Sequence, residues 1–471
     1  MTASLASAHS EKQASGSHNT EAQKFSSFAL GLDLNEVPNE LVDKAKGHLL
    51  DGLGIALAST GFDYGRSILA GAQALAGSGN ATVFGFGAKL PPVNAALANG
   101  VLIHGLDFDD THVTAIYHAT APALAAAFAA AEVSGSTGRE TLTAYIVGLE
   151  IGCRLGRAAE GGFHDRGFHP TAICGAFAAA FAAGRLLGLN QDQMVWASSL
   201  AGSQAAGILE TGGSSWLKRF HPGWAAHAGY SAAVLAKNGF VGAKTVFEGS
   251  HGIYQTHLQK IPQGDLTPSA GLRSNWQLAG IALKPYPCCH FIHGFVDAGL
   301  FLRERVAIAD IERIDCPLTK RLHPLVGEPR DRRIKPTTPY EAMFSVPYVV
   351  ALALVKGKVD LASFHDLGID DPEVLALSAK VYIHEDPLSD FPAHFPGEVR
   401  ITMKNGETIV RREATSTGTP ERALTRDQIE DKFMSLATRV TGQARAREIA
   451  DAVWRFDVLD NVADLARLCS L

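Results

Sequence analysis

The amino-acid sequence predicts a mainly α-helical protein in which a large all-helical domain is interrupted by a smaller α+β domain. Of its 471 residues, 46% are hydrophobic and 19% are charged, which is enough apolar material for a large buried core. From about residue 37 to 260, apolar residues recur at steps of three and four, the spacing of amphipathic helices. The pattern changes near 265–285 to shorter alternating segments, and helical spacing resumes at Thr425.

The first region is expected to form a compact helical bundle. Its first helix should follow Pro38, because Leu41, Ala45 and Leu49 form one apolar stripe. The later segments are rich in alanine and glycine, which let helices approach closely. Only residues 81–85 have a strand-like composition here. Further helices are expected at about 63–77, 91–106, 122–134, 138–158, 170–187, 191–209 and 223–237.

The α+β region carries strand and hairpin signals. Asn405-Gly406 is a strong signal for a two-residue hairpin turn, and Thr425-x-x-Gln428 is a capping box that opens the C-terminal helices. The expected elements are strands at 311–319 and 379–384, a hairpin at 398–411, and helices at 289–303 and 339–354.

These patterns divide the chain into four parts. Residues 1–24 are rich in small and polar side chains without an apolar run, so we expect a disordered tail and no signal peptide. The remaining parts are 25–268 and 416–471, which together make the helical domain, and 269–415, which makes the α+β domain.

Composition excludes several classes of protein. With 42 basic and 48 acidic residues the formal charge is −6, whereas a nucleic-acid binder usually has a basic excess. No apolar run reaches the length that spans a bilayer, so no membrane segment is expected. The six cysteines are too few and too scattered for a disulfide framework, which favours a reducing, cytoplasmic setting.

The stretch from His104 to His118 concentrates the residue types that acid–base chemistry needs. It holds three aspartates, three histidines and the hydroxyl of Thr111 between two apolar helices. Crowded titratable groups in apolar surroundings acquire shifted pKa values, which is typical of catalytic sites. The alternative is a helix cap with a few solvated charges.

Four further segments place polar groups beside apolar ones. His169 precedes Pro170 at a helix start, where it could meet an anion or act as a cap. Lys218 and Arg219 lie between aromatic residues, which suits carboxylate binding, although a surface lysine could equally lie along apolar neighbours there. Lys284 is isolated at the junction of the two patterns, where pockets are common. Tyr348 opens an apolar helix and is either a core residue or a catalytic one.

Cofactor and metal chemistry have no motif in the sequence. There is no GxGxxG, Walker A, HExxH, GxSxG or CxxC pattern. The Cys288-Cys289-His290 cluster with His293 is better explained as a helix start with a buried thiol than as a metal site. The candidate residues instead suit proton transfer next to a carboxylate, with the lysines neutralising a small polycarboxylate substrate.

Five motifs resemble the MmgE/PrpD family, in the same order and over roughly residues 25–465. They are HGLDFDDTH at 104–112, GLEIGCRLGRA at 148–158, GFHPTAICGAFAAAFAAGRLLGL at 167–189, KRFHPGWAAHAG at 218–229 and KPYPCCHFIHGFVDA at 284–298. The family includes 2-methylcitrate dehydratase, cis-aconitate decarboxylase and iminodisuccinate epimerase. The resemblance implies a helical domain with an inserted α+β lid, a homodimer, and a metal- and cofactor-free active site between the two domains.

The resemblance also assigns roles to residues of this chain. It implies that Asp107 and His118 are the acid–base centre, that Thr111 orients them and that Tyr348 donates a proton. It further implies that Lys218, Lys284 and His169 hold substrate carboxylates. The stretch from Tyr117 to Pro122 differs from the Gly-His-Pro-Ser-Asp-Asn of methylcitrate dehydratases, which disfavours 2-methylcitrate itself as the substrate.

We therefore expect a cofactor-independent lyase that dehydrates or decarboxylates a di- or tricarboxylate of the citrate, methylcitrate or cis-aconitate type. An isomerase that inverts a centre of a polycarboxylate such as iminodisuccinate is the first alternative, because it starts with the same proton abstraction. A catalytically silent binding protein on the same fold is the second.

Overall fold

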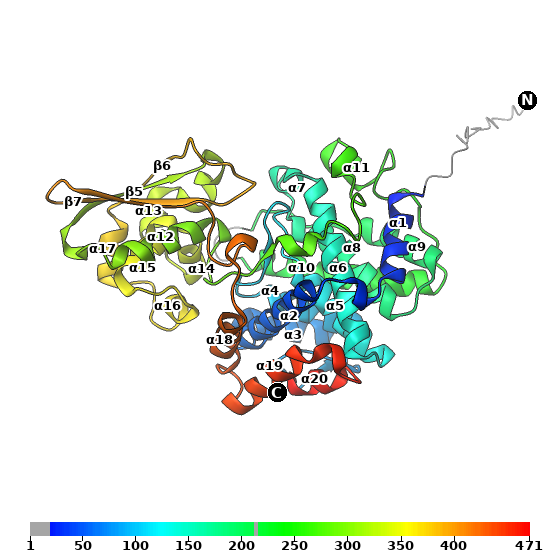
Figure 1. Cartoon of the computed structure of the whole chain (residues 1–471). Helices are drawn as coiled ribbons and strands as arrows, with labels where there is room; N and C mark the ends of the chain where they lie inside the picture. Colours follow the sequence, from blue (N-terminus) through cyan, green and yellow to red (C-terminus); the bar gives the residue numbers. More distant parts are fainter. Residues whose placement is uncertain (1–18, 212–214) are drawn as a thin grey trace, which may run out of the picture.

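The computed structural model describes residues 19–211 and 215–471, which form a helical domain and a smaller lid (Figure 1). Most of the predicted N-terminal tail, residues 1–18, lies outside the described residues. The prediction fails at its end, because helix α1 spans Glu21–Gly31 and begins with a capping box between Thr20 and Gln23. None of the described helices is long and apolar enough to cross a membrane.

The centre of the helical domain is made of alanine-rich helices that are buried on nearly every side. Helices α5 and α8 are the most apolar of them, and α10 crosses both α8 and α4. The crossing of α10 with α4 is close because it is built from glycines: a Cβ atom on Gly100 would meet the Cα of Gly223 at 2.7 Å. The bounds are α2 Asn39–Ser59, α3 Asp63–Ala76, α4 Pro92–His104, α5 Thr120–Ser134, α6 Gly138–Ala158, α8 Pro170–Leu186, α9 Gln191–Gly202 and α10 Leu217–Lys237.

The C-terminal helices return to this domain, as predicted. Helix α18 (Arg426–Ala437) packs along α2, followed by α19 (Gln443–Trp454) and α20 (Ala463–Leu468). Close contact again depends on small residues, since a Cβ on Gly54 would lie 2.9 Å from the ring of Phe433. In Figure 1 these helices lie beneath the helical domain, away from the lid sheet.

The lid is a four-stranded sheet with helices packed against it (Figure 1). The strand order is β6-β5-β7-β8, with β5 parallel to β6 and the other pairs antiparallel. Helices α12 and α15 line its apolar core, to which α15 contributes the unbroken buried run from Tyr348 to Leu354. The bounds are α12 His293–Arg303, β5 Ile311–Leu318, α13 Arg330–Ile334, α14 Pro339–Met343, α15 Val346–Lys356, α16 Leu361–His365, α17 Pro372–Ser378, β6 Val381–Glu385, β7 Gly397–Met403 and β8 Thr408–Glu413.

The lid begins later in the chain than residue 269. Leu278 and Ile281 are buried in the core of the helical domain, and strand β4 (Ile281–Ala282) pairs with β3 (Thr111–His112). The buried guanidinium of Arg154 holds this segment by donating hydrogen bonds to the carbonyls of residues 268, 270, 271 and 275. Such long-range hydrogen bonds have no signature in the local sequence pattern.

In the lid, the predicted helix 339–354 is divided into α14 and α15. In the helical domain, two bounds differ from the predicted ones by six residues or more. Helix α9 ends at Gly202 rather than near 209, and α10 begins at Leu217 rather than 223. The earlier start of α10 places Pro222 inside the helix and Lys218 in its first turn. The lysine is therefore held by a helix and not by a loop.

Candidate active site

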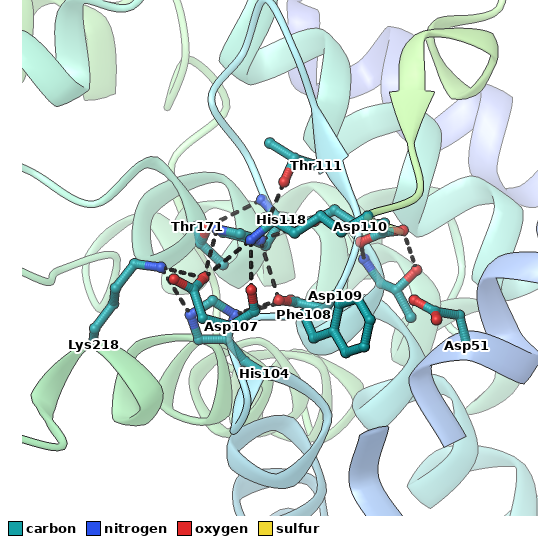
Figure 2. A network of polar contacts seen from close by, with 12 residues as sticks. Asp51, His104, Asp107, Phe108, Asp109, Asp110, Thr111, His118, Thr171 and Lys218 are labelled. Carbon is teal, nitrogen blue, oxygen red and sulfur yellow. Dashed lines mark hydrogen bonds and ion pairs between the residues drawn. The ribbon is translucent and has the colours of Figure 1, made fainter. Parts of the chain in front are cut away.

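The segment between α4 and α5 carries the acidic and imidazole groups, and it is buried although it is mostly irregular (Figure 2). Asp107 has a φ angle of 51°, in the left-handed region, which turns the chain immediately after α4. At the other end the carboxylate of Asp110 accepts hydrogen bonds from the backbone N–H (3.0 Å) and the hydroxyl (2.5 Å) of Thr120. The segment is thus fixed at both ends.

Two lysines converge on Asp107. The Nζ atom of Lys218 lies 2.7 Å from its Oδ1 atom, and Nζ of Lys284 lies 3.2 Å from the same oxygen. Lys284 also donates to the main-chain carbonyl of Asp107 at 2.7 Å. Burial raises the pKa of Asp107, but the two ammonium groups outweigh burial and hold that pKa well below its usual range. The trio therefore carries a net positive charge.

The imidazole of His118 lies beside this trio, with its two ring nitrogens in different surroundings. Its Nδ1 donates to the main-chain carbonyl of Asp110 at 2.8 Å and lies 3.5 Å from the hydroxyl of Thr111. Its Nε2 lies 3.9 Å from Oδ1 of Asp107. Because Nδ1 is committed to the carbonyl, Nε2 is the nitrogen that can exchange a proton with a bound molecule.

His104 and Asp109 form a histidine–carboxylate pair next to Asp107 and His118 (Figure 2). Nδ1 of His104 lies 2.9 Å from both carboxylate oxygens of Asp109, and its Nε2 lies 3.5 Å from Nζ of Lys218. Burial lowers the pKa of His104 to about 4, so the ring is neutral and Nε2 presents a lone pair to the lysine. This arrangement orients the ammonium group of Lys218 toward Asp107.

A third imidazole closes the cluster. The ring centroids of His104, His118 and His169 lie 4.5 to 5.9 Å apart. Nδ1 of His169 lies 3.0 Å from Nδ1 of His221, so one of the two donates a proton and the other accepts it. Burial keeps the pKa of His169 well below its ordinary value, and the ring is neutral.

Asp107, His118 and His169 line a cavity of about 390 Å³ between the helical domain and the lid, whereas His104, Asp109 and His221 lie behind its wall. Lys218 and Lys284 are joined there by three arginines of the lid, Arg321, Arg332 and Arg333, against two carboxylates, those of Asp107 and Glu341. The lid also contributes His290, whose two ring nitrogens have no hydrogen-bond partner among the described residues. The excess of cations makes the cavity suited to a small molecule with several negative charges.

Six of the eight residues predicted for the site line this cavity: Asp107, Thr111, His118, His169, Lys218 and Lys284. Arg219 and Tyr348 are not among its lining residues. The guanidinium of Arg219 lies 4.7 Å from the ring centroids of both Tyr64 and Tyr340, and its Nε donates to the carbonyl of Gly105. The interpretation of Arg219 as a substrate contact therefore has no support in its position.

Tyr348 lies in the core of the lid. Its side chain is fully buried in α15, with its ring centroid 6.4 Å from that of Phe364, and its hydroxyl has no partner among the described residues. In this arrangement Tyr348 does not reach the cavity, and its predicted role as a proton donor remains a prediction.

The chain matches two family models. Residues 23–263 match the MmgE/PrpD N-terminal domain, and residues 286–456 match the MmgE/PrpD C-terminal domain. The chain belongs to the MmgE/PrpD family. The second match begins where the structure places the lid, after β4.

Relatives of this chain include two kinds of lyase, cis-aconitate decarboxylases and 2-methylcitrate dehydratases. A cis-aconitate decarboxylase of Aspergillus terreus is 30% identical over 463 residues, which cover 94% of both chains. The cis-aconitate decarboxylase of Homo sapiens is 28% identical and covers 95% of this chain and 94% of the human one. A 2-methylcitrate dehydratase of Cupriavidus necator is 26% identical and covers 78% of this chain and 79% of that relative.

Several residues that shape this MmgE/PrpD site were not singled out from the sequence. His104 and Asp109 lie within the stretch from His104 to His118. Their spacing of five residues across the end of a helix is the sequence feature that could have indicated their contact. The ammonium of Lys432, on α18, donates to the carbonyls of Phe108 (2.9 Å) and Lys284 (2.8 Å). It joins two segments of the site that lie far apart in the sequence, and no local pattern marks it.

The cluster also contains donor atoms that could bind a metal ion. One ligand atom from each of His104, Asp107, Asp109 and His118 lies within 4.8 Å of the others. However, Asp107 is already in contact with the ammonium groups of Lys218 and Lys284, which would repel a cation. The local charge therefore favours an anion.

Buried neutral histidines are expected to make the fold sensitive to acid. Burial lowers the pKa of His112 from 6.5 to about 4 and that of His293 from 6.5 to about 3. Between these values the unfolded chain binds protons that the folded chain excludes, so the free energy of unfolding falls as the pH decreases from 6.5. Each residue should cost about 2 kcal/mol by pH 5. Melting temperatures from pH 7 to pH 5 test this, and His112→Gln should flatten the decline; an unchanged slope would contradict it.

Proposed function

We propose that this chain is a lyase that decarboxylates cis-aconitate or a closely related tricarboxylate, without a metal or cofactor. The observation that supports this most is the group of Lys218, Lys284 and Asp107 beside Nε2 of His118, in a cavity rich in cations. Cis-aconitate decarboxylases match 94–95% of the chain, whereas the 2-methylcitrate dehydratases match 65–78%. Decarboxylation is therefore favoured over dehydration.

The reaction needs one proton and a site for negative charge. When the methylene carboxylate of cis-aconitate leaves as CO₂, the electron pair of the broken C–C bond forms a new double bond to the central carbon. The former double-bond pair then takes a proton at the far carbon, and the product is methylenesuccinate. The protonated Nε2 of His118 supplies that proton, and its Nδ1–H remains held by the Asp110 carbonyl.

The cations have a separate role in this mechanism. As the allylic electrons shift, negative charge spreads onto the carboxylate next to the far carbon. Lys218 and Lys284, held in place by Asp107, stabilise that charge in a buried site. Arg321, Arg332 and Arg333 approach from the lid and are placed to hold the other carboxylates.

Proton NMR in D₂O, with and without EDTA, tests the proposed reaction on citrate, 2-methylcitrate, cis-aconitate and iminodisuccinate. We expect two new vinyl signals from cis-aconitate, one deuterium in the saturated methylene of the product, and no effect of EDTA. A new vinyl signal from citrate or 2-methylcitrate, with all carboxylates retained, would indicate a dehydratase. Deuterium exchange without a change of skeleton would indicate the isomerase, and silence would indicate a binding protein.

We also propose that the chain forms a homodimer through the outer face of α10. Exposed apolar side chains lie at both ends of this helix, Trp216 and Phe220 at its start and Val234 and Leu235 at its end, and exposed apolar surface is typical of an interface. The same helix carries Lys218 in its first turn, so dimer formation would stabilise the site. Leu235→Glu is expected to give monomers in sedimentation velocity, while Leu75→Glu on α3 should leave the dimer intact. Monomeric unmodified protein would contradict the proposal.

A cytoplasmic location is proposed on the state of the cysteines. All six are free and buried, and none is paired in a disulfide. Denatured protein should therefore titrate six thiols after isolation without reductant; fewer would argue for an oxidising compartment.

A further inference from the structure

Arg219 lies at the contact between the helical domain and the lid, although it is not among the residues that line the cavity of the candidate site. Its guanidinium carbon is 4.7 Å from the ring centroid of Tyr64, on α3, and also 4.7 Å from that of Tyr340, on α14. The first ring belongs to the helical domain and the second to the lid, and α14 lies on the side of the lid that faces the helical domain (Figure 1). One side chain therefore bridges the two domains.

On the helical-domain side, the contact is anchored beside the turn that carries Asp107. Nε of Arg219 donates a hydrogen bond to the carbonyl of Gly105 at 2.6 Å. Tyr64 packs directly on the same glycine, since a Cβ atom on Gly105 would lie 2.7 Å from the hydroxyl oxygen of that tyrosine. The hydroxyl donates to Ser59 at 3.1 Å, and the tyrosine is buried. The guanidinium and the ring of Tyr64 are therefore held at fixed positions next to Asp107.

On the lid side, the contact continues along α14 to Lys218. Tyr340 lies in this helix and Phe344 is its C-cap, four residues later, and their ring centroids are 4.9 Å apart. The ammonium nitrogen of Lys218 is 5.8 Å from the ring centroid of Phe344. Consecutive cations of α10 thus face neighbouring aromatic rings of the lid, and both rings line the cavity. The position of α14 decides which wall of the cavity faces the ammonium group of Lys218.

We propose that Arg219 is a positioning residue, which holds α14 on the helical domain so that Tyr340 and Phe344 form the wall beside Lys218. The planar guanidinium suits this role because it can stack on two ring faces at once, whereas an ammonium group is a compact, strongly hydrated point charge. The effect of Arg219 on the reaction rests on the proposed function. The contact between the two domains does not depend on it.

Arg219→Met is expected to raise KM for cis-aconitate by about tenfold and to leave kcat nearly unchanged. Without the bridge, the lid occupies the binding-competent position for only part of the time, and the apparent affinity falls by that fraction. A bound tricarboxylate attracts the cations of the lid and restores the position, so turnover at saturation is retained. A change that merely reduced the amount of folded protein would lower the apparent kcat and leave KM unchanged, and that result would overturn the proposal.

Two further variants make the test specific. Arg426→Met makes the same change over the ring of Trp454 (4.3 Å), a contact within the helical domain, and should keep the KM of the unmodified enzyme. Arg219→Lys keeps the charge, but because its ammonium group cannot stack on both rings, it should also raise KM. An equal rise of KM in Arg426→Met, or a normal KM in Arg219→Lys, would overturn the proposal.

A double-mutant cycle shows whether Arg219 acts through the lid or on the substrate. Tyr340→Leu removes the ring on the lid side. Adding Arg219→Met to it should raise KM no further, because both changes break the same contact. A further rise of about tenfold would mean that the guanidinium acts on the substrate independently of the lid, and the proposal would fail.

Hydrogen exchange followed by mass spectrometry tests the contact without substrate, on the full-length protein. The amides of residues 340–344 should exchange about tenfold faster in Arg219→Met, and those of β7 should be unchanged, because the contact is local. Unchanged exchange at 340–344 would overturn the proposal. If the unmodified protein converts no tricarboxylate, the proposed function fails, and this measurement still decides whether Arg219 holds the lid.

Discussion

Lys218→Ala is expected to lower kcat/KM for cis-aconitate by about 10²–10³-fold, through both a higher KM and a lower kcat. The ammonium of Lys218 is 2.7 Å from Asp107 and lines the cavity, so its removal takes away one of the charges that hold the tricarboxylate. It also removes the stronger of the two ion pairs that keep Asp107 ionised, and the pKa of Asp107 should rise. Steady-state kinetics at pH 7 measure the change in kcat/KM.

The fold should survive this change, because the side chain of Lys218 is 14% exposed and its loss buries no new polar group apart from Asp107. Lys244→Ala, at an exposed position away from the site, is the matched control and should keep the kinetics of the unmodified enzyme. Near-normal kcat/KM for Lys218→Ala would remove this lysine from the site. If Lys218→Arg kept the kcat/KM of the unmodified enzyme, the site would require only a positive charge at this position and not the smaller ammonium group.

The helical domain was predictable because its signals are local. Each long helix repeats apolar residues at its own spacing, and the predicted 138–158 and 63–77 agree with α6 and α3 to within one residue. The errors lie where distant parts of the chain decide the structure. The sequence pattern places residues 269–282 in the α+β domain, but Arg154 and strand β3 hold them on the helical domain.

The candidate site was predictable for a related reason, since Asp107, His118 and Lys284 are polar residues within apolar sequence. What could not be predicted is the direction in which a side chain points. Arg219 follows Lys218 directly, yet one turns into the cavity and the other is held between two tyrosine rings. Tyr348 starts an apolar helix of the lid, and nothing in the local sequence says which face of that helix meets the cavity.

Contacts across long sequence separations were beyond prediction altogether. Lys432 pairs with Asp51 at 2.6 Å and donates to the carbonyls of Phe108 and Lys284, so that three distant segments meet at one ammonium group. On the printed sequence Lys432 is an ordinary lysine of an amphipathic helix. Its position follows only from the packing of α18 along α2.

Asp107→Asn is expected to reduce kcat by about 10²–10⁴-fold while KM for the tricarboxylate stays the same or falls. The substitution keeps the shape of the side chain, and asparagine tolerates the left-handed φ of 51° at this position. What it removes is the negative charge 3.9 Å from Nε2 of His118, which stabilises the protonated imidazole that donates to the substrate. It also leaves the ammonium groups of Lys218 and Lys284 without their carboxylate partner. Their attraction for the negatively charged substrate is then stronger.

A lower kcat without a rise in KM distinguishes Asp107 from the lysines. A group that merely supports the fold would lower thermal stability and kcat and raise KM, whereas Asp107→Asn should leave the melting temperature within a few degrees. Asp192→Asn, at an exposed position of α9, is the matched control. If Asp107→Asn retained its kcat, the proton would have to come from another group. The next candidate would be His290 at the lid wall, whose two ring nitrogens have no hydrogen-bond partner among the described residues.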